Sequence, residues 1–205
     1  MRDLDRALAD IAAIRTQMAK GVVFRGLGPA TLAATGVLAI GVAGAQSLLV
    51  AAPGADAVSF LIVWTGTAVL AAALIGAEAI TRSRRLHSDL ADDLIRAAIE
   101  QFLPVAAAGA LLAVVLTRAA PESVWMLPGL WQILVGIGVF GAARLLPRGL
   151  ALAGAWYLAA GLAVLWIGAE TRTLSPWAMG VPFGAGQLLV AAILQLSVGG
   201  ADHDG

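Results

Sequence analysis

The 205-residue sequence contains no cysteine, two histidines and one tyrosine, and only 13% of its residues are charged. Without cysteine the chain can form no disulfide, thiolate nucleophile or cysteine metal site. Lys20 is the only lysine and lies outside every long apolar segment, which excludes a Schiff base inside a membrane. Neither histidine falls in such a segment, so there is no evident haem ligand. A formal net charge of zero gives no indication of a nucleic-acid partner, and we expect none.

Apolar residues, in contrast, make up 60% of the sequence, and its mean hydropathy is +0.89. Soluble domains carry about 25% charged residues. A helix needs about 20 apolar residues to cross a hydrocarbon core about 30 Å thick. The sequence therefore predicts an all-α bundle of six transmembrane helices joined by short connections. The expected spans are 27–52, 58–80, 102–118, 124–146, 149–168 and 177–198.

Two other segments have helical periodicity but are amphipathic. Within 1–26 an apolar stripe is formed by Leu4, Leu8, Ile11, Ile14 and Met18. Within 82–101, between the second and third spans, a second stripe is formed by Leu86, Leu90, Leu94, Ile95 and Ile99. Such stripes need an apolar surface to cover them. Which surface covers the N-terminal helix stays open. It can be the membrane interface, the rest of the chain, a second copy or another protein. The tail, 199–205, is short and polar.

Basic residues are distributed unequally between the two sides of the predicted bundle. Eleven lie on the side of the N-terminus, and only Arg118 and Arg172 lie on the other side. The positive-inside rule therefore predicts that both termini are cytoplasmic. The first residues show no cleavable signal pattern, so we expect the first span to direct insertion. Tryptophans fall towards the opposite ends of their spans, as an aromatic belt requires: Trp64, Trp125, Trp131, Trp166 and Trp177.

The second and fifth spans share a short sequence pattern. Trp64 and Trp156 each precede a glutamate, Glu78 and Glu170, by fourteen residues, with Ile-Gly-Ala before both glutamates. A three-plus-three repeat would reverse the orientation of the second half, an arrangement common in transporters. Alanine, glycine and leucine are frequent here, so matches also arise by chance. The inverted repeat is therefore a hypothesis.

Polar residues within the spans or at their ends are candidate functional positions because each costs free energy in a bilayer. Glu78 can instead form a salt bridge with Arg82, four residues later, at the membrane interface. Glu100 and Gln101 stand at the entry to the third span, where helix packing and ligand binding are both open. The candidate positions are Glu78, Glu100, Gln101, Gln132 and Gln187.

Gln132 and Gln187 each follow a segment rich in proline and glycine. A proline within a span frees a backbone carbonyl, which a neighbouring helix or a cavity must satisfy. Pro182 therefore suggests a sixth span that is broken and lines an outward-facing cavity. Gly180 and Gly184 also form a GxxxG pattern, which close packing against another helix explains more simply.

Metal and catalytic patterns do not fit the sequence. His87, Asp89, Asp92 and Asp93 lie on an exposed helix without a second histidine nearby, so we expect no metal site. No serine nucleophile with a base, phosphate-binding loop or pair of catalytic carboxylates is evident. We therefore predict no cofactor, no catalytic residue and no enzymatic activity.

Four segments, AIRTQMAKGVVFRGLGPATLAATG, SRRLHSDLADDLIRAAIEQFLP, LPGLWQ and SPWAMGVPFGAGQLL, resemble a family of small bacterial six-span integral membrane proteins. The resemblance implies a location in the bacterial inner membrane, and it implies no activity, ligand or site residue. Our first hypothesis is a non-enzymatic interaction or regulatory protein, which uses the N-terminal helix to bind a partner or a second copy. The alternative is a small inverted-repeat transporter or channel for a small solute.

Overall fold

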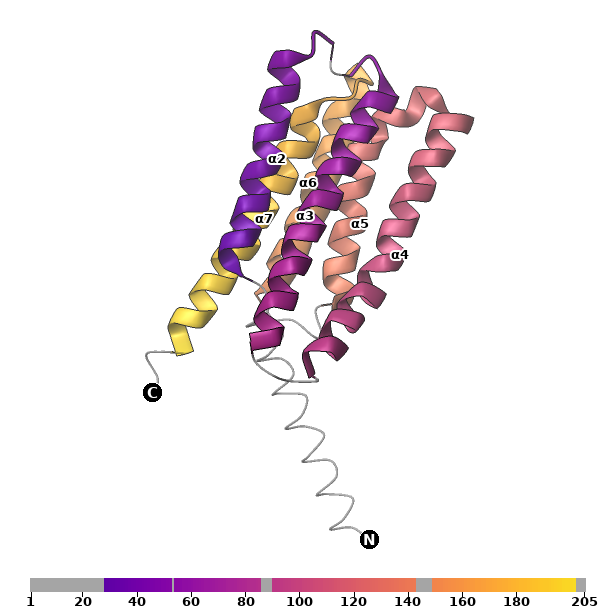
Figure 1. The fold of residues 1–205 in the computed structure, drawn as a ribbon. Coiled ribbons are helices and arrows are strands. Elements are labelled where there is room, and N and C mark those ends of the chain that lie inside the picture. The colour runs from indigo at the N-terminus through magenta and orange to yellow at the C-terminus, as the bar shows by residue number, and fades with distance from the viewer. Residues whose placement is uncertain (1–27, 53, 86–89, 143–148, 202–205) are drawn as a thin grey trace.

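The structure, a computed structural model, describes residues 28–52, 54–85, 90–142 and 149–201 (Figure 1). All regular elements in these ranges are helical. They are α2 (Pro29–Leu49), α3 (Ala57–Arg85), α4 (Leu90–Ala119), the 3-10 helix η1 (Pro121–Met126), α5 (Leu127–Ala142), α6 (Leu150–Thr171) and α7 (Pro176–Ala201). The amphipathic helix predicted within 1–26 lies outside the described residues.

Six segments of the described chain are long and apolar enough to cross a membrane, each with 20 to 25 residues and a mean hydropathy of 1.6 to 2.2. The fourth joins η1 to α5 over Pro121–Ala142. This confirms the predicted all-α fold with six spans, and the chain is a membrane protein. The helix α4 runs from Leu90 to Ala119, so the amphipathic segment from Leu90 onward and the third span form one continuous helix.

Local chemistry explains where α3 begins. Asp56, just before the helix, accepts a hydrogen bond on Oδ1 from the Val58 N–H at 3.0 Å and one on Oδ2 from the Ser59 hydroxyl at 2.5 Å. The Ser59 hydroxyl and the Val58 amide hold the pKa of Asp56 below its ordinary value, because both stabilise the carboxylate. A negative charge at this end also interacts favourably with the helix dipole.

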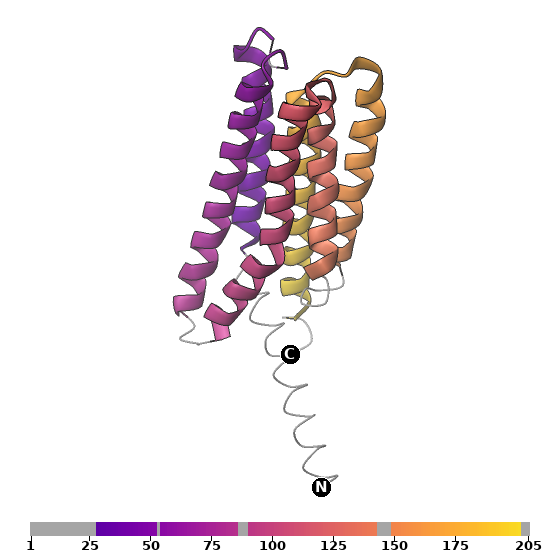
Figure 2. The same ribbon diagram turned by 90° about the vertical axis from the view of Figure 1, so that its right-hand side faces the viewer.

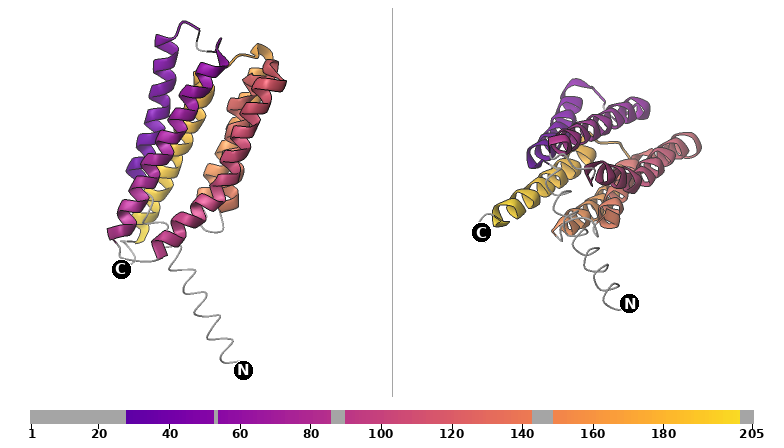
Figure 3. Two further views of the ribbon diagram at one scale, coloured as in Figure 1. Left: turned by 45° about the vertical axis from the view of Figure 1, so that its right-hand side comes forward. Right: turned by 60° about the horizontal axis from the view of Figure 1, so that its bottom comes forward.

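The six membrane helices form two groups of three, one of α2, α3 and α7 and the other of α4, α5 and α6 (Figure 3). The most extensive contacts by far are those between α2 and α7 and those between α5 and α6. Smaller contacts of α7 with α5 and α6, and of α3 with α4, connect the two groups. Figure 2 shows α3 and α4 on the outside of the bundle.

Glycines allow the close approach in both extensive contacts. A Cβ added to Gly36 of α2 would lie 2.9 Å from the carbonyl oxygen of Gly184 of α7, and one added to Gly184 would lie 3.0 Å from that of Gly36. Gly129 of α5 and Gly161 of α6 face each other in the same way, at 2.7 and 2.6 Å. Gly180 also packs on the backbone of α2. The packing role predicted by the GxxxG pattern is therefore confirmed.

The arrangement of helices agrees with the three-plus-three repeat only in part. The repeat makes α2 equivalent to α5, α3 to α6 and α4 to α7, so it maps one group of three onto the other. The most extensive contacts do not obey the repeat. It would make the contact of α2 with α7 equivalent to that of α5 with α4, but the second contact is much smaller. Trp64 is buried whereas its counterpart Trp156 is 38% exposed. The internal duplication stays a prediction from the sequence.

Candidate functional site

Glu78 reaches from α3 to the start of α2. A Cβ on Gly28, the residue that precedes α2, would overlap the Glu78 carboxylate. The first amides of a helix lack acceptors within the helix, and this end carries partial positive charge. The carboxylate therefore lies where a negative charge is stabilised, and glycine at position 28 leaves room for it. The side chain of Arg82, the partner suggested by the sequence, lies outside the described side chains.

Gln101 reaches from α4 to α5. A Cβ on Gly141 of α5 would overlap its Nε2 atom, and a Cβ on nearby Gly138 would lie 3.1 Å from Val105. Gln101 is half-buried whereas Glu100 is exposed. The structure therefore places Gln101 in the contact between α4 and α5. It does not bring Glu100 to the same contact.

Gln132 and Gln187 share an unusual environment. Gln132 of α5 is 2% exposed, and its carbonyl oxygen Oε1 has no hydrogen-bond partner. The Oε1 atom of Gln187 on α7 is also buried and unpaired. In native structures most buried polar side-chain atoms are hydrogen bonded, and leaving one unpaired costs about 1–3 kcal/mol. Among the described residues, only these two side-chain atoms are buried without a partner.

Tyr157 of α6 lies against Gln187. Its side chain is 1% exposed, its hydroxyl donates to the carbonyl oxygen of Phe183 at 3.4 Å, and the Gln187 side chain is within hydrogen-bonding reach of the same hydroxyl. Because Oε1 of Gln187 is unpaired, the group that faces the tyrosine oxygen is its amide NH₂. A Cβ on Gly186 would overlap the phenol ring and hydroxyl, so glycine there makes room for Tyr157.

Gln132 and Tyr157 lie at the same level of the contact between α5 and α6. Gly129 faces Gly161, and Gly136 faces Gly154, so these two glycine contacts bracket both polar residues. Successive residues of an α-helix are turned by about 100° around its axis. Gln132 and Tyr157 therefore each point about 50° away from the line through the two glycines of their own helix, and both are turned in the same rotational sense. In two antiparallel helices, equal rotations point to the same side of the contact. Gln132 therefore points to the side on which Gln187 meets Tyr157.

We call Gln132, Tyr157 and Gln187 the central amide cluster. Gln132 is the twelfth of the 22 residues of its span, and Gln187 is the twelfth of the 21 residues of Pro176–Leu196, so both lie near the middle of the membrane. The cluster also connects the two groups of helices, since α5 and α6 belong to one and α7 to the other. The sequence placed both glutamines among the candidate functional positions but not Tyr157, although a lone tyrosine within a span was a usable signal.

Ionisable residues of the six described spans fall near the span ends. They are Glu78, Glu100, Arg118, Glu122, Glu170 and Arg172, which directly follows α6. In the described part of the chain no three histidine, aspartate or glutamate side chains come together as a metal site would require. His87 and Asp89, which the sequence considered as metal ligands, lie outside the described residues. The central amide cluster is therefore polar but has no formal charge.

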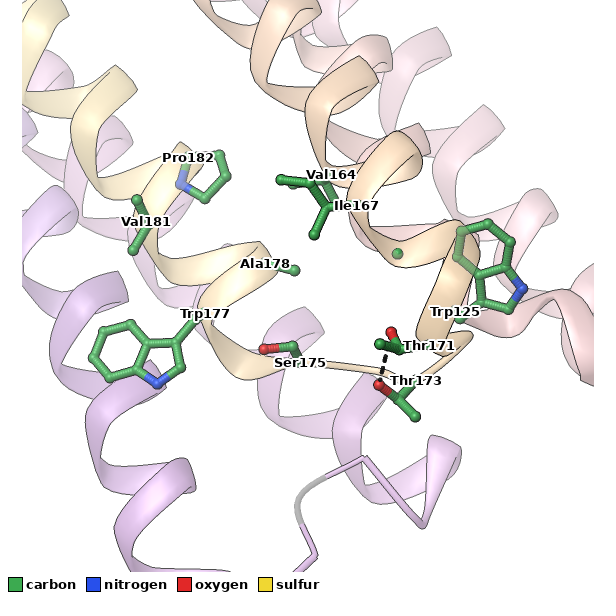
Figure 4. Close-up of a pocket in the computed structure, with 11 residues that line it drawn as sticks. Trp125, Val164, Ile167, Thr171, Thr173, Ser175, Trp177, Ala178, Val181 and Pro182 are labelled. Atoms are coloured by element: carbon green, nitrogen blue, oxygen red, sulfur yellow. Dashed lines mark hydrogen bonds between the residues drawn. The ribbon is translucent and has the colours of Figure 1, made fainter.

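A groove of about 300 Å³ lies between the end of α6 and the beginning of α7 (Figure 4). It is mainly apolar, and Trp125, Trp177 and Ile167 are among its lining residues. The prediction of a broken sixth span is wrong, because α7 continues as a helix through Pro182. The carbonyl oxygen of Pro182 accepts a hydrogen bond from the Trp156 indole at 2.9 Å. Ile167 is 70% exposed, so the groove opens towards the surroundings of the bundle.

Comparison of the chain with protein-family models, with curated proteins and with solved structures finds no match.

Proposed function

We propose that the protein is a non-enzymatic membrane interaction protein, and that the exposed face of α3 binds a transmembrane helix. The observation that supports this is the unequal burial of the spans. Only 6% of the span in α4 and 17% of that in α3 are buried inside the bundle, against 28–44% in the other four. Lipid provides no hydrophobic driving force between helices, so membrane helices associate through packing. A helix with so little packing of its own has a large surface available for another chain.

The exposed face of α3 also carries two glycines and an alanine, together with one valine, at helical spacing. Gly66, Val69, Ala73 and Gly76 lie at steps of three and four, which places them on one side of the helix. A Cβ added to Gly66 or Gly76 would meet nothing within 4 Å. The glycines at the two extensive helix contacts, in contrast, face a neighbouring backbone. We call these four residues the α3 seam, since small residues at this spacing let a second helix approach closely.

The absence of cysteine makes the α3 seam directly testable. A single thiol introduced by Ala73→Cys, labelled in native membranes with a maleimide that carries a photoreactive group, should crosslink to a protein. An adduct of twice the subunit mass identifies a second copy, and another mass identifies a different protein. The matched control is Ala45→Cys on α2, which is also exposed and should give no protein adduct.

A second change shows whether the crosslink reports packing at the seam. Gly66→Leu in the A73C background fills the seam and should abolish the adduct. Crosslinking to lipid alone at both A73C and A45C would contradict the proposal, as would an adduct that survives Gly66→Leu.

A transporter or channel for a small solute is the second candidate, and the central amide cluster favours it. Solute sites in transporters lie near the middle of the membrane, where two helical units meet. Solute-dependent swelling of proteoliposomes, reduced by Gln132→Leu and absent from empty liposomes, would support this function.

We also propose that the membrane is the inner membrane of a bacterium and that α2 begins on the cytoplasmic side. The distribution of basic residues supports this orientation. Arg118 and Arg172, at the ends of α4 and α6, are the two that fall on the other side. The N-terminal amphipathic helix would then be a second, cytoplasmic element for binding a partner.

A further inference from the structure

We propose that the central amide cluster is a binding site for a small uncharged solute that donates hydrogen bonds, of the amide, urea or alcohol class. The inference is independent of the α3 seam, because it concerns other helices and other atoms. Its basis is that two carbonyl oxygens, one on Gln132 and one on Gln187, are buried near the middle of the membrane and have no partner.

The unpaired atoms define the hydrogen-bonding character of the ligand. Both are acceptors, so the ligand must donate. The hydrogen of the Tyr157 hydroxyl is already donated to Phe183, so this group cannot donate to Gln187 at the same time. Turning either amide by 180° would place an unpaired NH₂ where the unpaired oxygen was. A ligand with both donors and acceptors, such as a primary amide, matches either orientation.

The surroundings exclude a charged or large ligand. Ionisable residues of the described spans lie near the span ends, so an ion in the middle of the membrane would have no counter-charge there. The contacts of Gly129 with Gly161 and of Gly136 with Gly154 bring the backbones of α5 and α6 together on both sides of the cluster. Any ligand held between these contacts must therefore be small.

Binding can be measured by saturation-transfer NMR, which detects weak ligands, on the full chain in lipid nanodiscs with acetamide and with glycerol as probes. Saturation should transfer from the protein to at least one probe. Gln132→Leu and Gln187→Leu each remove one acceptor and should weaken binding about tenfold, the effect of losing one hydrogen bond. Gln195→Leu is the matched control, because this glutamine also lies on α7 but is exposed. The Gln195→Leu variant should bind the probes as well as the wild type does.

The melting temperature separates a ligand site from a structural role. Leucine fills nearly the same space as glutamine without an unpaired oxygen, so Gln132→Leu should melt at the same temperature as the wild type or higher while it loses the ligand. A lower melting temperature would show that Gln132 stabilises the fold, and it would overturn the proposal. Equal saturation transfer in the wild type and in Gln132→Leu would also overturn the proposal. The absence of transfer to both probes would overturn it as well, and it would leave ordered water as the occupant of the cluster.

Discussion

Buried glutamines in this protein differ in whether another helix supplies a partner. Gln46 of α2 is 7% exposed, and its Oε1 accepts a hydrogen bond from the Trp64 indole of α3 at 3.0 Å. Gln132 is buried to a similar degree, but its Oε1 is unpaired. A buried hydrogen bond contributes to stability, whereas an unpaired carbonyl lowers it. Glutamine therefore has opposite energetic effects at these two positions.

This difference leads to a test at Gln46. Gln46→Leu leaves the indole N–H of Trp64 without an acceptor and should lower the free energy of unfolding by about 1–3 kcal/mol. Denaturant titration of the protein in mixed micelles, followed by tryptophan fluorescence, measures the change. Gln195→Leu should change stability by less than about 0.5 kcal/mol, because this residue is exposed. Equal destabilisation by the two substitutions would show that the indole bond makes no net contribution.

The sequence located polar candidates better than it located their partners. Gln132 and Gln187 were recognisable because amides are costly in a span, but whether they are paired depends on helices distant in the sequence. For Glu78 the sequence suggested Arg82, whose side chain lies outside those described, and it did not indicate the approach of the carboxylate to Gly28 of α2. Tyr157 was not among the candidate positions, because its place beside Gln187 depends on space provided by Gly186 of another helix.

At the scale of helices, length and composition were sufficient to predict the spans but not their neighbours. A span that is apolar on all sides has no periodic stripe to show which face is inside. The contact of α2 with α7 therefore could not be read from periodicity, although Gly180 and Gly184 indicated that α7 has a close neighbour. The predicted break at Pro182 failed because a membrane helix can continue through a proline, as α4 also does at Pro104.

The glycine contacts predict position-dependent effects of larger side chains. Gly161→Leu would direct a side chain into the backbone of α5 at Gly129, and this overpacking should lower stability by about 1–3 kcal/mol or more. Gly41→Leu on α2 is the control, since a Cβ there meets nothing within 4 Å. Thermal unfolding of the two variants in the same detergent compares them. If both variants unfold at the same temperature, the close contact of α5 with α6 contributes nothing to stability.

For the whole molecule, composition predicted the fold class, but the division into two groups of three helices appeared only in the structure. The division depends on α7 packing with α2, the last and the first of the described spans, whereas α4 packs with α5, the next span in the chain. No local pattern encodes the contact between the first and last spans. The repeat suggested by Trp64 and Trp156 is consistent with the membership of the groups, but their internal contacts differ.

Orientation in the membrane can be tested with two thiols at opposite ends of the bundle. Thr173→Cys lies in the exposed connection between α6 and α7, and Thr81→Cys lies near the far end of α3 and is also exposed. In intact cells a membrane-impermeant maleimide should label T173C, whereas T81C should react only after lysis. The reverse pattern would show that the positive-inside rule does not determine the orientation of this chain.

The contact of α2 with α7 also determines when the bundle can be completed during synthesis. Of the described spans, α2 leaves the ribosome first and α7 last, so α2 waits through the production of four other spans before its main neighbour exists. During this interval the side of α2 that carries Gly36 faces lipid or the insertion machinery. The arrival of α7 therefore closes the assembly, and a chain interrupted before α7 leaves this side of α2 uncovered, where a quality-control protease can recognise it.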